Sequence, residues 1–278
     1  MRIATATARE SSVNLCCALA ALLGAWMTGA QAHDFWLEPS VFRPAPGAEV
    51  TFRINVGQDF HGNSMIYLPE VFERYVYVGP DGENDVPGIP GDDPAGKIRV
   101  VKPGLVTVGY RSTTFTLGFD TLDEFERYLK LEGLEHIAAL RKRLGKPDHN
   151  ITEVYSRAAK SLLAVGAVKP DAADRRLGFT LELIAERNPY ALHAGATLPV
   201  RLLYKNRPLV DAQVTAFTKD APLQKLRARS DKNGKVNLAL ARPGVWLITC
   251  VHMVPAARGA GADWESIWGS LTFELPAS

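Results

Sequence analysis

Segments in which apolar and polar residues alternate recur through the first third of the chain beyond residue 33. Residues 50–56 read Val-Thr-Phe-Arg-Ile-Asn-Val, the period of two that is typical of a half-buried β-strand. Further strands are predicted over residues 34–37, 74–78, 97–101 and 105–111. Residues 57–63 and 79–96 are predicted to be loops, since Gly, Pro and Asp gather there.

The last hundred residues carry the same kind of pattern. Strands are predicted over residues 179–184, 198–204, 213–218, 226–229, 235–240 and 245–253. Asp231-Lys232-Asn233-Gly234 is predicted to be a tight hairpin turn. Short strands at this spacing, with turn residues between them, favour a β-sandwich.

Between these two regions lies a stretch whose apolar residues recur at helical spacing. Thr121 and Glu124 form a capping box, and apolar residues follow at helical spacing. Gly133 is expected to divide this stretch into two helices. Asn150 and Glu153 suggest the start of another helix, so that residues 119–168 as a whole are predicted to be a helical insertion that covers a sheet.

The two β regions resemble each other in sequence. Lys102-Pro103-Gly104-Leu105 corresponds to Arg242-Pro243-Gly244-Val245, and Pro46-Gly47 corresponds to Ala194-Gly195. An internal repeat of ~100 residues indicates two related sandwich domains, because one sandwich has that size. We therefore expect a first β domain at 33–118, the helical insertion at 119–168 and a second β domain at 169–278.

The start of the chain is typical of an export signal. Arg2 and Arg9 precede a run of 13 apolar or small residues, 15–27, which is short for a membrane span. Ala30 and Ala32 have the spacing of a signal-peptidase site. We expect residues 1–32 to be removed after Ala32, leaving a periplasmic protein without a membrane anchor.

Cleavage at that point makes His33 the first residue. A terminal histidine offers two nitrogen ligands, its α-amine and its imidazole, to one metal ion. Such ligands suit borderline metals, so the expected ion is Ni, Co or Cu. An alternative is that the peptidase simply follows the small residues and that His33 has no role.

Charge and cysteine content narrow the function classes. The expected mature chain has 30 Lys and Arg against 29 Asp and Glu, a balance that argues against a nucleic-acid partner. Cys16 and Cys17 fall in the signal, and their neighbours do not suit a lipid anchor. Cys250 remains alone and is expected to be a small apolar residue of a buried strand.

Other candidate ligands come from the six histidines. His136, His149 and His193 are expected at the surface, whereas His252 ends a predicted strand and His61 lies in a Gly-rich loop. We expect His252 or His61 to complete the site at His33. Compact metal, nucleophile-elbow and phosphate-loop motifs are absent from the sequence, and its carboxylates are scattered.

Several motifs add a family resemblance. His33-Asp34-Phe35-Trp36-Leu37-Glu38-Pro39, Asn188-Pro189-Tyr190, Val251-His252-Met253 and Asp263-Trp264-Glu265-Ser266-Ile267-Trp268 resemble a periplasmic domain-of-unknown-function family associated with nickel and cobalt uptake. The resemblance covers nearly all of the mature chain. It implies export, a mainly β fold of two Ig-like β-sandwich domains, and a link to transition-metal transport.

Three function classes follow. The first is a periplasmic protein that binds or delivers a transition metal, with a nickel/cobalt membrane transporter as partner, and it is not an enzyme. The second is a metal-free cell-envelope interaction module. The third is a copper oxidase in which an N-terminal histidine and another histidine hold the metal, as in lytic polysaccharide monooxygenases.

Overall fold

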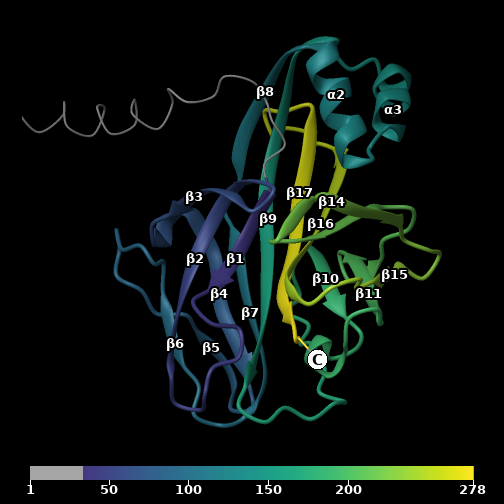
Figure 1. The fold of residues 1–278 in the computed structure, drawn as a ribbon. Coiled ribbons are helices and arrows are strands. Elements are labelled where there is room, and N and C mark those ends of the chain that lie inside the picture. Colours follow the sequence, from purple (N-terminus) through teal and green to yellow (C-terminus); the bar gives the residue numbers. More distant parts are fainter. Residues whose placement is uncertain (1–33, 278) are drawn as a thin grey trace, which may run out of the picture. The chain divides into compact units, whose positions relative to one another are not determined.

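The computed structural model describes residues 34–277. The expected signal peptide, its cleavage point and His33 lie outside the described residues. The described chain belongs to one compact unit and is mainly β (Figure 1). The predicted fold class, mainly β with two sandwiches and a helical insertion, is confirmed.

A nine-stranded sheet runs through the middle of the described chain (Figure 1). Its order is β14-β13-β16-β17-β9-β7-β4-β5, and β8 also pairs with β9. The bounds are β4 Phe72–Gly79, β5 Gly82–Asp85, β7 Gly104–Ser112, β8 Phe115–Thr121, β9 His149–Val165, β13 Gln213–Thr218, β14 Ala221–Arg229, β16 Gly244–Pro255 and β17 Trp264–Leu275.

Two smaller sheets cover this central sheet. The first contains β1 Asp34–Pro39, β2 Glu49–Gln58, β3 His61–Met65 and β6 Lys97–Arg99. The second contains β10 Leu181–Ala185, β11 Thr197–Tyr204, β12 Arg207–Pro208 and β15 Lys235–Ala239. Short 3-10 turns, η1 Pro69–Val71 and η2 Pro189–Ala191, lie between strands.

The smaller sheets lie on opposite faces of the central sheet. Side chains of successive strand residues point to opposite faces. Ala159 of β9 packs with Phe35 and Leu37 in the core beneath the first sheet. Its neighbour Ala158 packs with Leu181 in the core beneath the second sheet. Each half of the chain thus forms a sandwich, and both sandwiches share the central sheet.

The two halves of the central sheet meet along a parallel pair of strands. β17 runs parallel to β9, from Trp264 opposite Glu153 to Thr272 opposite Ser161. The other strand pairs given for this sheet are antiparallel. Thr272 also donates a hydrogen bond from its hydroxyl to the carbonyl of Leu37 at 2.8 Å, which ties the seam to β1.

The helical insertion is shorter than predicted. It contains α2 Leu122–Glu132 and α3 His136–Leu144, and the capping box of Thr121 and Glu124 is present. Gly133 ends α2 in the left-handed conformation, with φ of 69°, so the predicted division at this glycine is confirmed. The helices pack at one end of the described body (Figure 1).

The prediction of a helix from Asn150 onward is wrong. Residues His149–Val165 form β9, a central strand whose second half is buried on both faces. Such a strand reads as a continuous apolar run rather than an alternating one. A continuous apolar run fits the spacing of a helix as well as that of a strand, so the periodicity of the sequence could not distinguish the two.

Some loops and turns also differ from the predictions. Residues 61–63 and 82–85, expected in loops, lie in strands β3 and β5. Asp231 and Gly234 do form a turn, in which the Gly234 amide donates to the Asp231 carbonyl at 2.9 Å. This turn joins β14 to β15, which lie in different sheets, so it is not the hairpin that the sequence suggested.

Matching turns support the predicted internal repeat. Gly47 and Gly195 both have positive φ, 81° and 86°. The Gly47 amide donates to Val100, and the Gly195 amide donates to Leu240, both at 2.7 Å. The two motifs therefore hold equivalent corners of the two sandwiches.

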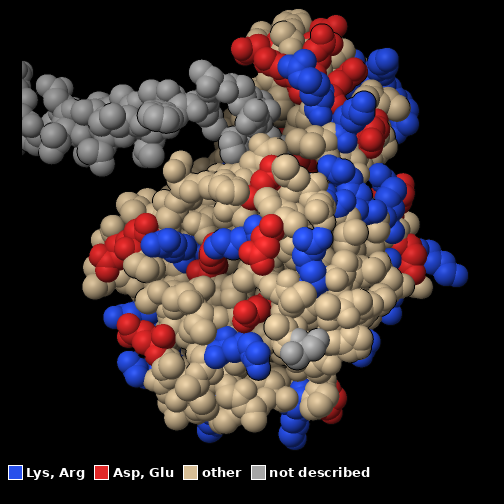
Figure 2. Space-filling view, viewed as in Figure 1, with Lys and Arg blue, Asp and Glu red and all other residues tan. Residues whose placement is uncertain are grey.

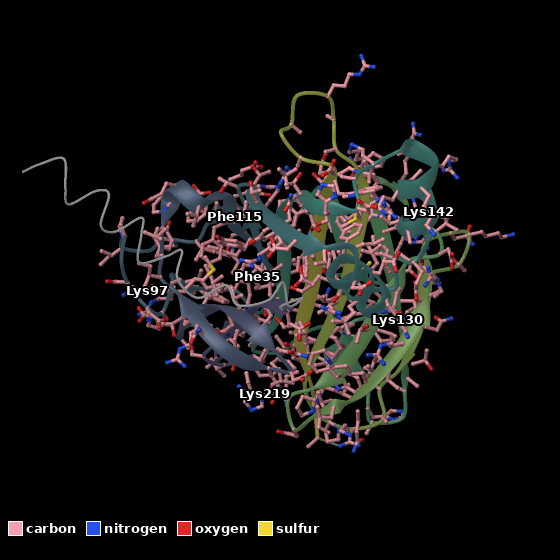
Figure 3. All side chains as sticks on the ribbon, turned by 90° about the horizontal axis from the view of Figure 1, so that it is seen from above. Phe35, Lys97, Phe115, Lys130, Lys142 and Lys219 are labelled. Atoms are coloured by element: carbon pink, nitrogen blue, oxygen red, sulfur yellow. The ribbon has the colours of Figure 1, made fainter. Side chains whose placement is uncertain are left out.

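Charged residues are spread over the surface. On the face in Figure 2, Lys and Arg alternate with Asp and Glu, as the near-neutral net charge suggests. Phe35 lies near the middle of the described body, and Lys97 and Lys142 lie on opposite sides of it (Figure 3). Among the described helices, none has the length and apolar character needed to cross a membrane.

Candidate functional site

A small acidic pocket lies where the described chain begins. It lies between the start of β1, the end of α2 and the middle of β16 and β17, and its volume is about 10 Å³, room for about one water molecule or ion. Its lining consists of Asp34, Phe35, Glu132, Thr249, Cys250, Val251, Trp268 and Gly269. The pocket therefore joins parts of the chain that are far apart in sequence.

Local structure holds both acidic residues in place. Asp34 pairs with Gly57 at the end of the β1–β2 ladder. Glu132 is the last residue of α2. The side-chain amide of Gln213 donates to the Leu131 carbonyl at 3.0 Å. This contact fixes the end of the helix against the central sheet.

The electrostatics of the pocket disfavour negative charge on Glu132. Burial, followed by the nearby charge of Asp34, raises the pKa of the Glu132 carboxyl to about 8. Lys225 and Arg227 lower that pKa but do not offset the rise. A cation placed beside the two carboxyl groups would therefore favour the ionised form of Glu132.

A third carboxyl group lies behind the pocket. Glu153 is fully buried, and its Oε1 accepts hydrogen bonds from the hydroxyls of Tyr128, at 3.2 Å, and Ser266. The indole of Trp268, which lines the pocket, donates to Ser266 at 3.0 Å. Burial raises the pKa of Glu153 to about 7, despite these hydrogen bonds, which lower it.

His61 is connected to the pocket through Asp59. The Asp59 amide donates to Oδ2 of Asp34 at 3.1 Å, and the Asp59 carbonyl lies 2.8 Å from Nδ1 of His61. His61 pairs with Gln58, one residue beyond the partner of Asp34. The exposed His61 ring therefore lies at the same end of the first sheet as the start of β1.

His252 lies on the other face of the central sheet from β1. It shares its face with Cys250 and Ile248, which are in the core beneath the second sheet. Its ring packs on Tyr204, with 4.3 Å between the ring centroids. Burial, with the nearby charges of His136 and Lys205, lowers the pKa of His252 to about 4, so its ring is neutral near pH 7.

The cysteine and the other three histidines lie where the sequence predicted them. Cys250 is a free thiol with 2% exposure, and burial raises its pKa to about 12. His136, His149 and His193 are exposed. Within residues 34–277, no group of three or more His, Cys, Asp and Glu side chains could by itself hold a metal ion.

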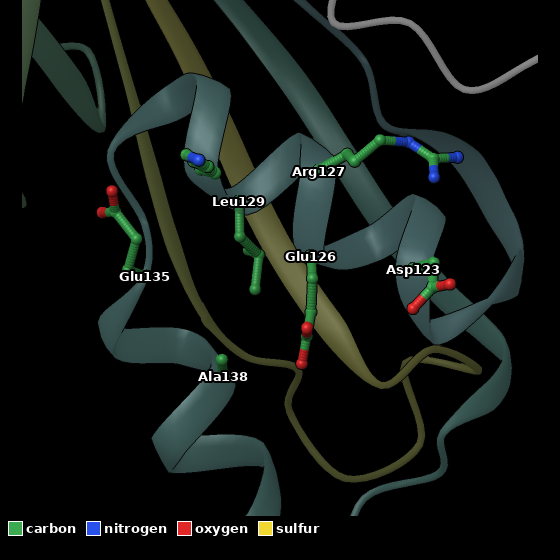
Figure 4. A pocket seen from close by; sticks show the side chains of 7 residues that line it. Asp123, Glu126, Arg127, Leu129, Glu135 and Ala138 are labelled. Carbon is green, nitrogen blue, oxygen red and sulfur yellow. The ribbon is translucent and has the colours of Figure 1, made fainter.

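A wider hollow lies between α2 and α3. Its volume is about 470 Å³, and its lining includes Asp123, Glu126 and Arg127 from α2 and Glu135 and Ala138 from the following segment (Figure 4). The acidic pocket at Asp34 is the better candidate for chemistry, because burial and the neighbouring charge of Asp34 raise the pKa of Glu132 there to about 8.

The sequence did not reveal the pairing of Asp34 with Glu132. These carboxylates are scattered in the sequence, and the fold brings the two together with Glu153 nearby. Glu132 reads in the sequence as an ordinary helical surface residue. Only the Gly133 stop signal, which ends α2 at this point, indicated a special position.

A family described as a domain of unknown function (DUF4198) matches residues 30–254. No curated protein matches the chain. Among solved structures, the D0-D1 domain of Intimin is 13% identical, with 85% of this chain and 96% of that chain covered and a TM-score of 0.20. Murine CEACAM1b is 10% identical, with 88% and 100% covered and a TM-score of 0.21. A Salmonella alpha-2-macroglobulin mutant is 13% identical, with 87% and 15% covered and a TM-score of 0.18.

Proposed function

The chain belongs to the DUF4198 family of unknown function, and we propose that it is an exported protein that binds a transition metal at its mature N-terminus. In this proposal the signal peptide is cut after Ala32. The metal ligands are the α-amine and imidazole of His33 together with the acidic pocket of Asp34 and Glu132. The protein delivers nickel or cobalt to a membrane transporter.

The acidic pocket is the observation that supports this proposal best. Asp34 is covalently bonded to His33, so a chain that starts at His33 has its α-amine one residue from the pocket. Two carboxyl groups meet there, and the pKa of Glu132 is raised to about 8. A metal ion with two or three positive charges would favour ionisation of both groups.

The available donors fit the expected metals. Amine and imidazole nitrogens combined with carboxylate oxygens suit Co, Ni, Cu and Zn. A site of carboxylates alone would suit Mg or Ca instead. When bound, such an ion would supply a strong positive charge between α2 and β1.

Of the two expected histidine partners, His61 is favoured over His252. His61 is exposed at the same end of the first sheet as Asp34, and the two are connected through Asp59. His252 faces the other side of the central sheet and packs on Tyr204. We therefore propose that His61 supports the site and that His252 is a core residue.

The proposal is tested by titrating three forms of the protein with Ni, Co, Cu and Zn under calorimetry. The forms are the chain from His33, the same chain with Ala32 retained, and His33→Ala. The first should bind most tightly, since the other two lose the amine chelate or the imidazole. Equal affinity in all three forms would exclude the N-terminal site and would favour the metal-free interaction module.

Further variants assign the remaining ligands. Glu132→Gln should weaken binding by about 10- to 100-fold, the effect of losing a group that supports a metal site. Glu135→Gln is the matched control, because Glu135 is exposed in the next segment of the chain. His61→Ala should weaken binding and His252→Ala should leave it unchanged; the reverse result would contradict the assignment.

A further inference from the structure

Lys160 is a buried lysine that the proposed metal site does not use. It lies in the middle of β9, between Gly109 of β7 and Leu271 of β17. Its side chain is 1% exposed and points into the core beneath the second sheet. Burying an ammonium group without a partner costs free energy, so the residues around Lys160 must compensate its charge.

Two carboxyl groups surround the Lys160 amine. Nζ lies 2.9 Å from Oδ1 and 3.0 Å from Oδ2 of Asp174. Nζ is also 3.3 Å from Oε1 of Glu182 and 3.0 Å from the carbonyl of Arg175. The side chains of Asp174 and Glu182 are 0% and 1% exposed.

Hydrogen bonds fix both carboxyl groups. Asp174 accepts from the Thr107 hydroxyl at 2.9 Å and from the Ala185 amide at 3.0 Å. Glu182 accepts from the amides of Leu177, at 2.6 Å, and Gly178, at 3.0 Å. Burial raises the pKa of Asp174 although the nearby Lys160 ammonium lowers it.

We propose that Lys160 and Asp174 form an intramolecular isopeptide bond, with Glu182 as the group that accepts a proton from the lysine. The carboxyl carbon of Asp174 lies between two oxygens that are both about 3 Å from Nζ, within the ~3.5 Å range of a near-attack geometry. The side chains of Lys160 and Asp174 are 1% and 0% exposed, within the half of the molecule whose core contains Leu162, Leu177 and Leu181. Water is therefore kept from competing with the amine.

The reaction is a condensation that needs no oxidant and no cofactor. Glu182 takes one proton from the ammonium group, and the neutral amine forms a bond from Nζ to the carboxyl carbon. The Thr107 hydroxyl and the Ala185 amide donate to the carboxyl oxygens as negative charge builds on them. One of these oxygens then takes the proton held by Glu182 and a second proton from Nζ, and its bond to carbon breaks as water leaves.

The amide also removes an unfavourable arrangement. A buried ion pair gains little over an uncharged contact, because both charges lose their hydration. Condensation replaces the charges of Lys160 and Asp174 with one neutral amide. It also closes a loop between β9 and the start of the second half of the chain.

Mass spectrometry of the unfolded mature protein tests the proposal. The intact mass should be lower than the sequence mass by one water molecule. Trypsin, which spares the Lys169-Pro170 bond, should release a peptide of residues 158–175 that is uncleaved at Lys160 and lacks one water. An intact chain of full mass, or cleavage at Lys160, would overturn the proposal, and so would water loss at Asp171 alone.

Variants separate the chemistry from folding. Lys160→Arg and Glu182→Gln should show the full mass. Asp174→Asn should form the same product by losing ammonia, so its mass should equal that of the linked wild type. Lys235→Arg, in the partly exposed pair with Glu186, is the control that should still lose water. Since the wild-type mass alone decides the question, variants that fail to fold do not leave it open.

Discussion

Glu153, the buried carboxyl group behind the acidic pocket, makes the stability of the protein depend on pH. Glu153 is fully buried with a pKa of about 7, above its usual value of 4.5. A carboxyl group with a raised folded-state pKa is more readily protonated in the folded than in the unfolded chain. Its stabilising contribution is complete below pH 4.5 and is lost as pH rises through 7.

We predict that Glu153→Gln flattens this dependence. Between pH 4.5 and 8 the wild type should lose about 3 kcal/mol in free energy of unfolding through Glu153 alone, from the shift of its pKa. The variant cannot ionise at this position and should lose less over the same range. Urea unfolding at pH 5 and pH 8 measures the difference between the two proteins.

Glu70→Gln is the control for this experiment, because Glu70 is exposed. That variant should follow the wild type at both pH values. If Glu153→Gln also follows the wild type, then Glu153 titrates normally in the folded protein. The hydrogen bonds from Tyr128 and Ser266 would then hold its ionised form.

At this scale the sequence predicted some residues and missed others. Cys250 could be interpreted from its neighbours, because a buried apolar strand is a local signal. Glu132, Glu153 and Lys160 could not, because their partners come from distant elements. Lys160 in particular lies in a run of Ala, Leu and Val where only the fold supplies Asp174 and Glu182.

Strand β7 of the central sheet carries a glycine where the segment that leads into β10 approaches closely. A Cβ at Gly109 of β7 would lie 2.0 Å from Cδ1 of Leu177 and 2.9 Å from Cζ of Phe179. Both side chains are in the core and are at most 4% exposed. They have little room to move, because protein cores are closely packed.

We predict that Gly109→Ala destabilises the protein by about 1–3 kcal/mol through overpacking. Gly118→Ala is the matched control, since Gly118 is a strand residue of β8 with nothing within 4 Å of the added Cβ. Its effect should stay within about 0.5 kcal/mol. Thermal unfolding followed by circular dichroism compares the two, and equal effects would contradict the close approach at Gly109.

Element types were predictable where the local signal was unambiguous. Thr121 and Glu124 marked the start of α2, and Gly133 marked its end. Half-buried strands such as β2 and β11 showed their alternation. β9 did not, because the sheets cover both of its faces and its sequence lost the period of two.

The molecule as a whole should unfold in one step. The two sandwiches share the central sheet, and the β9–β17 pair runs through its middle. We predict a single thermal transition for the mature chain, with agreement between the calorimetric and van't Hoff enthalpies. Two separate transitions would show that the halves are independent domains.

A variant at the seam extends this prediction. Leu271→Ala, at a fully buried position of β17, should cost about 2–5 kcal/mol and should lower the whole transition rather than split it. Leu223→Ala, at a position that is 82% exposed, is the control and should change little. A split transition in Leu271→Ala alone would mean that one half survives without the seam.

The parallel seam also sets an order of events for a chain that leaves the ribosome or a translocon from its N-terminal end. β9 emerges early, yet its partner β17 follows about 100 residues later, which at about 5–20 residues per second is a delay of roughly 5–20 s. During that time one edge of β9 can pair with any other nascent strand. A chaperone that shields residues 153–161 until Trp264 appears would therefore act on the step at which this protein is most exposed to aggregation.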